Sequence, residues 1–228
     1  MQPGLQGRKI NLPAAKLLGG TSALNAQALV APSKAGIDAW AKLGNAGWDW
    51  SSLSPYYRKF YSLTLPNEAT RKHLRLEWID ESVRGDSGPI KASFINTQEN
   101  AMAKAWIETY DKFHLGTSGD PFTGESIGAY TNMSTVDAST KTRSYSASAY
   151  AAPAFNRSNF RLITDAGVQK IHLRKPESGF VADGVEVIIN GEKSVVDASI
   201  FPTIPRGNIQ SSVYTVAEKA ADLLKAAA

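Results

Sequence analysis

The spacing of apolar residues predicts loops and two short helices in the first 60 residues. Residues 1–37 are rich in glycine and proline, which favours loops. Residues 37–43 are typical of a short helix that ends at Gly44, and Asp49 or Ser51 can cap a second helix. The apolar side of that second helix would carry Leu53, Tyr56, Tyr57 and Phe60.

The middle of the chain alternates between irregular and periodic stretches. Residues 61–88 are polar and lack a clear period, so we expect irregular structure there, ending in a turn at 84–89. Residues 90–94 alternate as a strand does, whereas 101–113 and 144–151 are typical of helices. The apolar side of the 101–113 helix would carry Met102, Trp106, Ile107 and Tyr110.

From residue 160 onward the apolar period changes to two, which indicates strands. The Asn190-Gly191 pair is typical of a hairpin turn, and Ser211 or Ser212 can start a last helix that ends at Leu224. The pattern predicts an antiparallel β-meander and an α+β chain. The alternating runs are Leu162-Ile163, Val168 to Leu173 and Phe180 to Ile189.

Composition is that of an ordinary globular protein. The chain has 228 residues, enough for one large domain or two small ones, and 43% of them are hydrophobic. The formal net charge is +4, but acidic residues at 77, 80 and 81 follow the densest basic stretch, 71–75. Such a mixed run is typical of a solvated helix face, so we expect no nucleic-acid partner.

The absence of some residue types excludes several kinds of site. The sequence has no cysteine, which excludes disulfides, a thiolate nucleophile and cysteine-ligated metals. The three histidines, His73, His114 and His172, do not have the spacing of metal ligands, so we expect no metal site. We find no long apolar run and no signal peptide, and therefore expect a cytoplasmic protein without a membrane partner.

Residues 17–25 carry the most informative chemistry in the chain. Gly19 and Gly20 permit positive φ and close approach of a ligand to the backbone. Thr21 and Ser22 add hydroxyl groups, and Asn25 offers both a donor and an acceptor. From these residues alone, a phosphate or cofactor loop and an ordinary Gly-Gly turn before a helix are equally good interpretations.

A resemblance favours the cofactor loop. Residues 15–38 resemble the first signature of the glucose–methanol–choline (GMC) oxidoreductases, which are flavin-dependent alcohol oxidases and dehydrogenases. The likeness continues through 38–50, Tyr56 to Phe60 and 142–150, and again in 196–210. In its details the sequence resembles the fungal members of this family. Leu29 departs from the aromatic residue or alanine that the signature prefers. The matching signature positions are Gly19, Gly20, Thr21, Ser22, Asn25, Pro32 and Asp38.

The resemblance implies FAD as the cofactor and assigns parts of the chain to it. Residues 1–60 would belong to the FAD-binding domain, 61–155 to the substrate region, and 156–228 to the β-meander with a flavin-contacting helix segment. The fold would therefore be α+β, with parts of a flavin domain flanking the substrate region. The cofactor-binding residues would be Gly19, Gly20, Thr21, Ser22, Asn25, Asp197, Ala198, Asn208 and Ile209.

Two family features do not occur in this sequence. There is no Gly-x-Gly-x-x-Gly fingerprint, which seats a dinucleotide pyrophosphate, and no segment like the one that carries the family's catalytic histidine. The sequence is interpreted as a member of this family that has lost its amino terminus and a large internal block. None of the three histidines lies in a family-like context, so no catalytic residue is assigned.

Two functions remain. The first is an FAD-dependent oxidoreductase that acts on a CH–OH donor by hydride transfer, impaired in this chain. The second is a non-redox protein, such as a cyclase, an isomerase or a small-molecule binding module, that uses the same substrate cavity without flavin. Either function takes a small-molecule substrate, an alcohol or an apolar metabolite. Candidate cavity residues are Tyr56, Tyr57, Trp106, Tyr130 and Tyr145.

Overall fold

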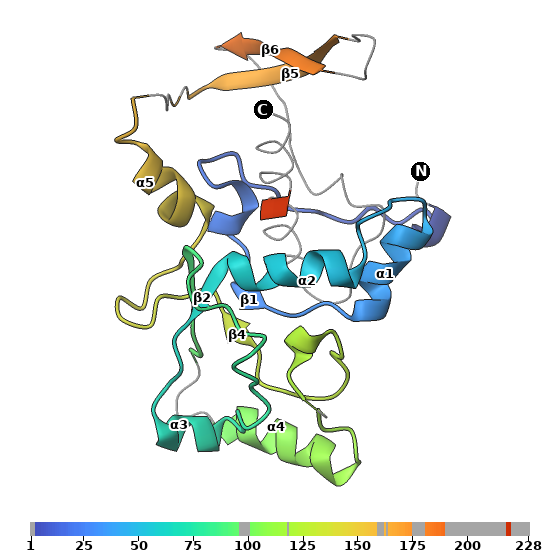
Figure 1. Cartoon of the computed structure of the whole chain (residues 1–228), viewed down its shortest axis with the longest axis vertical. Coiled ribbons are helices and arrows are strands. Elements are labelled where there is room, and N and C mark those ends of the chain that lie inside the picture. Colours follow the sequence, from blue (N-terminus) through green and yellow to red (C-terminus); the bar gives the residue numbers. More distant parts are fainter. Residues whose placement is uncertain are drawn as a thin grey trace. The chain divides into compact units, whose positions relative to one another are not determined.

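The structure is a computed structural model of the whole chain (Figure 1). It describes residues 3–95, 101–117, 119–158, 162, 164–174, 181–189 and 218–219. The chain divides into two units, Met1–Pro153 with Thr203–Ala228, and Ala154–Pro202. Helices and small sheets together make the mixed α and β structure that the sequence predicted.

Two consecutive helices form where the sequence predicted them. Helix α1 spans Lys34–Lys42 and helix α2 spans Trp50–Lys59. Ser33 and Asp49 cap them, because their side-chain oxygens accept hydrogen bonds from the backbone N–H groups two or three residues into each helix. The helices bury one face each, and of the predicted apolar residues of α2 only Tyr56 is not fully buried. The buried residues are Ile37, Trp40, Trp50, Leu53 and Tyr57, with Phe60 directly after α2.

Two small sheets lie beside these helices. Strand β1 (Ala28–Leu29) pairs antiparallel with β4 (Met133–Ser134), and β2 (Tyr61–Leu63) pairs parallel with β3 (Ile90–Ala92). Ser93 and Ser134 exchange both of their backbone hydrogen bonds, at 2.9 and 2.8 Å, which links the two sheets. Segments distant in sequence therefore share one core.

The expectation of irregular structure over 61–88 is wrong in part. Strand β2 and helix α3 (Glu68–His73) lie in this stretch, and Tyr61, Leu74 and Leu76 are buried. Elements of three and six residues are too short to show a period in the sequence. Tyr61 becomes part of a strand only because it pairs with Ile90 across the sheet.

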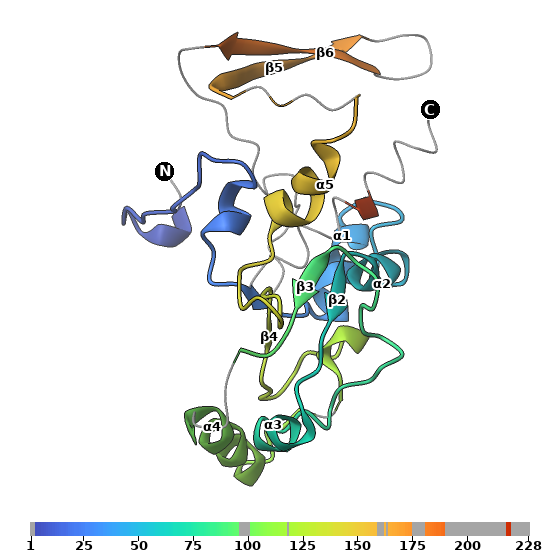
Figure 2. The same cartoon turned by 90° about the vertical axis from the view of Figure 1, so that its left-hand side faces the viewer.

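Helix α4 (Ala101–Lys112) confirms the helix predicted over 101–113. Most of its predicted apolar side, however, is not buried. Ile107 is buried, whereas Met102 and Trp106 are 72% and 60% exposed. Helices α3 and α4 lie side by side at one end of the first unit (Figures 1 and 2). An ion pair between Arg75, just after α3, and Asp111 of α4 joins them at 3.4 Å.

Short helical turns complete the first unit, and the last of them ends at Ala154, where the second unit begins. They are the 3-10 helices η1 (Pro3–Leu5), η2 (Gly20–Ala23) and η3 (Pro121–Thr123), the π-helix η4 (Ala147–Ala151), and α5 (Ala152–Ala154), which continues from η4. Glu218 contacts two of the earlier elements. It accepts a hydrogen bond from the Tyr150 hydroxyl at 3.0 Å and pairs with Lys59 at 3.4 Å.

The second unit contains a β-hairpin. Strands β5 (Ala166–Arg174) and β6 (Val181–Ile189) pair antiparallel, from Ala166 opposite Ile189 to Arg174 opposite Val181. This confirms two of the predicted strands. The Asn190-Gly191 turn and the helix predicted from Ser211 lie outside the described residues, apart from a helical Glu218-Lys219 pair. Among the described helices, none has both the length and the apolar character to cross a bilayer.

Candidate cofactor loop

The loop over residues 19–25 (the Gly19–Asn25 loop) has an unusual backbone that its two glycines permit. Gly19 has φ +91° and precedes η2, and Gly20 has φ +54°. The turn is closed by hydrogen bonds from Gly20 N–H to Leu17 O at 2.9 Å and from Asn25 N–H to Thr21 O at 3.0 Å. Among the residues that the structure describes, and apart from its two chain neighbours, no atom lies within 4 Å of the position that a Cβ would take at Gly20. The backbone at Gly20 is therefore open to a ligand on that side.

Gly19 is glycine for a different reason. A Cβ at this position would lie 2.9 Å from Cδ2 of Tyr145 and 3.2 Å from the backbone nitrogen of Ala147. The left-handed backbone and the close approach of residues 145–147 both require glycine here. The two glycines, which the sequence could not tell apart, therefore differ: Gly19 packs against Tyr145 and Ala147, whereas no described residue packs on Gly20.

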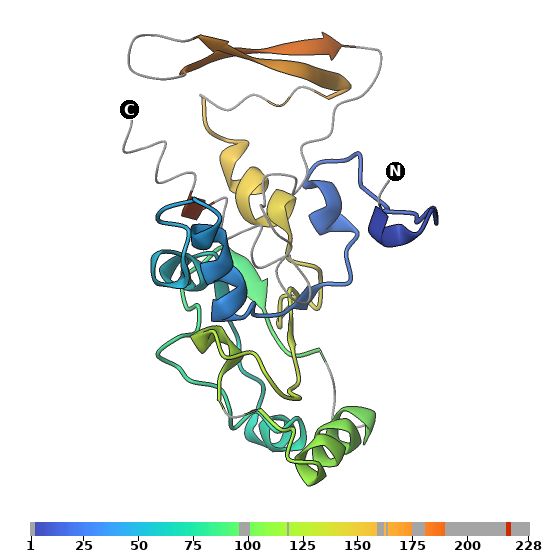
Figure 3. The ribbon, with the colours of Figure 1, turned by 90° about the vertical axis from the view of Figure 1, so that its right-hand side faces the viewer.

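Two serine hydroxyls connect the loop to residues 142–151. Oγ of Ser22 lies 2.8 Å from Oγ of Ser146, and both hydroxyls are within hydrogen-bonding distance of the carbonyl oxygen of Gly19. The turn η2 lies next to η4 in the ribbon (Figure 3). The Ser22 hydroxyl therefore stabilises the loop through hydrogen bonds within the protein.

The side chain of Asn25 is oriented by two donors. Its Oδ1 accepts from Nη1 of Arg143 at 2.8 Å and from the backbone N–H of Gln27 at 3.0 Å. Nη1 of Arg143 also lies 3.4 Å from the carbonyl oxygen of Ser22. Arg143 and Ser146 lie in the 142–150 segment that carried the resemblance, but the sequence assigned no role to either side chain, and it placed Tyr145 of the same segment in a substrate cavity. Nothing in the sequence shows that this segment contacts a loop more than 100 residues earlier.

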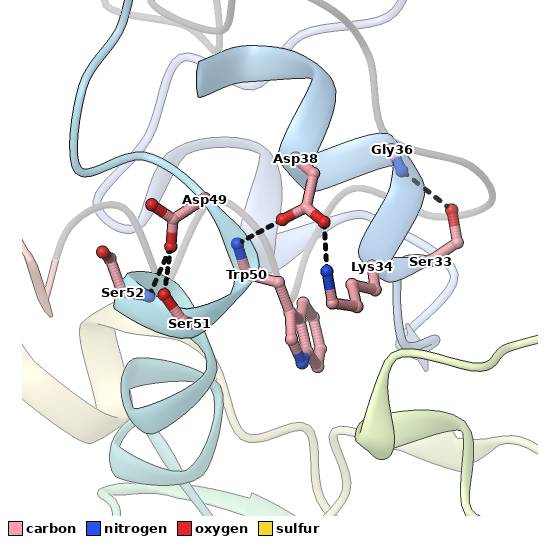
Figure 4. Close-up of polar contacts among 8 residues, drawn as sticks. All are labelled: Ser33, Lys34, Gly36, Asp38, Asp49, Trp50, Ser51 and Ser52. Atoms are coloured by element: carbon pink, nitrogen blue, oxygen red, sulfur yellow. Dashed lines mark hydrogen bonds and ion pairs between the residues drawn. The ribbon is translucent and has the colours of Figure 1, made fainter. Parts of the chain in front are cut away.

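Asp38, the last of the matching signature positions, holds α1 and α2 together (Figure 4). Lys34 and Asp38 form an ion pair one helical turn apart, and Oδ1 of Asp38 accepts from the backbone N–H of Trp50 at 2.8 Å. The bond to Lys34, followed by that to Trp50, lowers the pKa of Asp38. Asp38 thus connects two helices.

A family model described as GMC oxidoreductase matches residues 3–200 of the chain. The chain belongs to the GMC oxidoreductase family. This confirms the resemblance that the Gly19–Asn25 loop and the 142–150 segment indicated. FAD is the cofactor that membership of this family implies.

The chain is similar to fungal members of the GMC family. It is 32% identical over 214 residues to dehydrogenase mpl7 of Monascus purpureus, covering 92% of this chain and 33% of that protein. The fold resembles an FAD-dependent oxidoreductase from Chaetomium thermophilum, with a TM-score of 0.67, 28% identity and coverage of 82% and 33% of the two chains. A fungal aryl-alcohol oxidase has the same fold at a TM-score of 0.63, 20% identity and coverage of 78% and 32%. The chain spans about a third of the length of the relatives it matches.

The donors around the Gly19–Asn25 loop suit the flavin half of FAD. Because Oδ1 of Asn25 is occupied by two donors, its amide presents the Nδ2 side as a donor. The Thr21 hydroxyl is exposed beside the open backbone of Gly20. Hydroxyl and amide donors of this kind match the oxygen acceptors of a polyol chain or a phosphate. The other predicted cofactor residues, Asp197, Ala198, Asn208 and Ile209, lie outside the described residues.

The three histidines lie in different elements. His73 is in the last turn of α3, His114 follows α4 with φ +57°, and His172 lies in β5 of the second unit. Within the ranges that the structure describes, no group of three or more His, Cys, Asp or Glu side chains is placed to hold a metal ion.

The five aromatic residues predicted to line a cavity have different surroundings. Tyr57 is buried in the core and stacks on Trp50, whereas Trp106 is exposed on α4. The three remaining side chains are Tyr56, which lies under the ammonium groups of Lys59 and Lys219, Tyr130, which meets the edge of Trp78, and Tyr145, which packs on Gly19.

Proposed function

We propose that this chain supplies the flavin loop and part of the substrate region of an FAD-dependent oxidoreductase that oxidises a CH–OH donor. The observation that carries the proposal is the Gly19–Asn25 loop. Its backbone is open at Gly20, and Arg143 and Ser146 hold it through hydrogen bonds to Asn25 and to the carbonyl oxygen of Gly19. Family membership supports the same cofactor. When bound, FAD would accept the hydride that leaves the donor carbon.

The residues of the chain would bind and orient the cofactor. The open backbone at Gly20 would allow the flavin half to approach closely, and Thr21 and Asn25 would donate hydrogen bonds to its oxygen atoms. By resemblance, Asp197 and Ala198 would contact the ribityl–phosphate region, and Asn208 and Ile209 the pyrimidine end. No residue is assigned as the base that takes the hydroxyl proton.

We expect the 228-residue chain by itself to bind FAD weakly and to turn over alcohols slowly. Its sequence contains no Gly-x-Gly-x-x-Gly to seat the pyrophosphate. Each charge-assisted hydrogen bond to that group is worth about 1.5–3 kcal/mol, so several of them change affinity by orders of magnitude.

The test is FAD binding by the full chain, measured by equilibrium dialysis and by flavin absorbance of the purified protein. Turnover is then assayed with added FAD and a panel of aliphatic, aromatic and sugar alcohols. Because the Monascus relative is named a dehydrogenase, dye reduction is measured beside peroxide production.

Saturable FAD binding with slow alcohol-dependent dye reduction supports the proposal. A folded chain that binds no FAD at millimolar concentration contradicts it. Conversion of an unsaturated substrate by such a flavin-free chain, without any redox change, would instead support the non-redox function. Alanine variants of His73, His114 and His172 are expected to leave any turnover unchanged.

A further inference from the structure

Arg143 reaches the Gly19–Asn25 loop because the polypeptide returns along the sheet. Strand β4 pairs with β1, and Thr135 N–H donates to Gln27 O at 2.9 Å just beyond that pairing. A turn at residues 137–142, closed by Asp137 N–H to Thr142 O at 2.9 Å, then brings Arg143 into a bridge opposite Val136. Ser144 N–H donates to Thr135 O at 2.9 Å and continues the pairing. The backbone thus fixes Arg143 near Asn25 independently of its side chain.

The hydrogen bond from Arg143 to Oδ1 of Asn25 also fixes which side of the Asn25 carboxamide faces outward. Both partners of Oδ1, the guanidinium of Arg143 and the backbone N–H of Gln27, are donors only. A flipped amide would place its NH₂ group against two N–H donors, so the observed orientation is strongly preferred. Nδ2 must then point away from Arg143.

We propose that Arg143 is a positioning residue that orients the Asn25 carboxamide so that its Nδ2 donates a hydrogen bond to an oxygen acceptor of FAD. The inference rests on the proposed function. Arg143 does not contact the cofactor in this scheme. It acts through Asn25, and its contact with the carbonyl oxygen of Ser22 holds the first half of the same loop.

The main test is a double-mutant cycle on FAD affinity in the full chain. We compare the wild type with Arg143→Met, Asn25→Ala and the double variant by equilibrium dialysis against FAD. Each single substitution is expected to raise the dissociation constant about tenfold, the effect of one lost hydrogen bond. If Arg143 acts only through Asn25, the double variant is no weaker than Asn25→Ala within about twofold.

The matched control is Lys141→Met. Lys141 is an exposed cation two residues before Arg143. Its removal changes the net charge equally without touching Asn25, so the dissociation constant should stay within about twofold of the wild type. A tenfold loss in Lys141→Met would show that general charge attraction, and not orientation of Asn25, explains the effect of Arg143→Met.

A second variant separates orientation from stability. Asn25→Asp keeps an oxygen for Arg143 and forms an ion pair with it, so the melting temperature should not fall. It removes the Nδ2 donor, so FAD affinity should fall at least as far as in Asn25→Ala. If the role of Arg143 were only structural, FAD affinity would follow the melting temperature. Wild-type affinity in Asn25→Asp would overturn the inference.

The outcomes distinguish the inference from the function. If the wild type binds FAD but Arg143→Met binds it equally well, the inference fails and the proposed function stands. If the dissociation constant of the double variant rises by the product of the two single increases, the inference likewise fails and the proposed function stands. If the wild-type chain binds no FAD, both are overturned.

Discussion

The carboxylate of Asp38 in α1 accepts a hydrogen bond from the backbone N–H of Trp50 at 2.8 Å, the first residue of α2. An N–H in the first turn of a helix has no partner within that helix, so a side chain from another element satisfies it here. The same carboxylate pairs with Lys34. Asp38 therefore fixes the angle between two helices that bury Trp40, Leu53 and Tyr57.

We predict that Asp38→Ala lowers the free energy of unfolding by about 1–2 kcal/mol, because the Trp50 N–H loses its acceptor. Asp38→Asn keeps an acceptor oxygen and loses only the ion pair with an exposed lysine, worth about 0.3–0.5 kcal/mol. Urea denaturation of both variants measures the difference. Equal losses would show that the ion pair, and not the bond to Trp50, stabilises the helix pair.

The same side chain predicts a pH dependence. The pKa of Asp38 is lowered in the folded chain, chiefly by its bond to Lys34. The unfolded state therefore takes up the proton first as the pH falls, so the contribution of Asp38 is present at neutral pH and is lost below about pH 4. Unfolding free energies from pH 6 to about pH 3 should decline less steeply in Asp38→Asn than in the wild type. Parallel curves would contradict the prediction.

Asp120 should behave differently because it is buried. Its side chain is only 4% exposed, and burial raises its pKa although two backbone N–H groups counteract this. Oδ1 accepts from Phe122 N–H at 2.8 Å and Oδ2 from Asp80 N–H at 3.0 Å. Asp120→Asn removes the buried charge but sets an NH₂ group against one of these donors. We expect a loss of about 1–3 kcal/mol in unfolding free energy.

The control for this prediction is Asp80→Asn, since the Asp80 side chain is exposed and accepts a hydrogen bond from the backbone N–H of Ser82, while its charge acts on Asp120 only through space. Its loss should be under about 1 kcal/mol. Asp120→Asn with unchanged or higher stability would mean that relief of the buried charge outweighs the reversed hydrogen bond.

Alanine substitutions at two glycines with similar φ angles distinguish the cost of a left-handed backbone from the cost of steric crowding. Gly19 and Gly44 have φ +91° and +95°, but only at Gly19 would a Cβ meet another side chain, that of Tyr145. Gly44→Ala should cost about 1 kcal/mol for the left-handed conformation alone. Gly19→Ala should cost clearly more, up to about 3 kcal/mol, because it also displaces the Tyr145 ring. Thermal or urea unfolding measures both, and equal losses would argue against tight packing of residues 145–147 on the loop.

Gly20 tests whether the open side of the loop faces the cofactor. Gly20→Val places a branched side chain there and disfavours φ +54°, so FAD binding should be lost. Gly20→Asn is the control for backbone strain, because asparagine tolerates the left-handed region. It should retain the fold by circular dichroism and still weaken FAD binding through its added side chain. Unchanged FAD affinity in folded Gly20→Val would show that this side of the loop does not face FAD.

Local sequence alone determined several features of this protein. Apolar spacing and the stop at Gly44 predicted α1, and a cap at Asp49 or Ser51 with the apolar spacing after it predicted α2, because capping and amphipathic spacing act over a single turn. Alternation predicted the paired strands β5 and β6 in the same way. The Gly-Gly loop was recognised as a candidate site because a positive φ limits the choice of residues.

Tertiary structure decided what lies against these elements. The apolar spacing of α4 showed which residues share a face, but only packing shows that Met102 and Trp106 remain exposed. The short strand at Tyr61 exists because Ile90 pairs with it. The orientation of Asn25 depends on Arg143, 118 positions later. A hydrogen bond depends on distance in space, and a sequence pattern reports only distance along the chain.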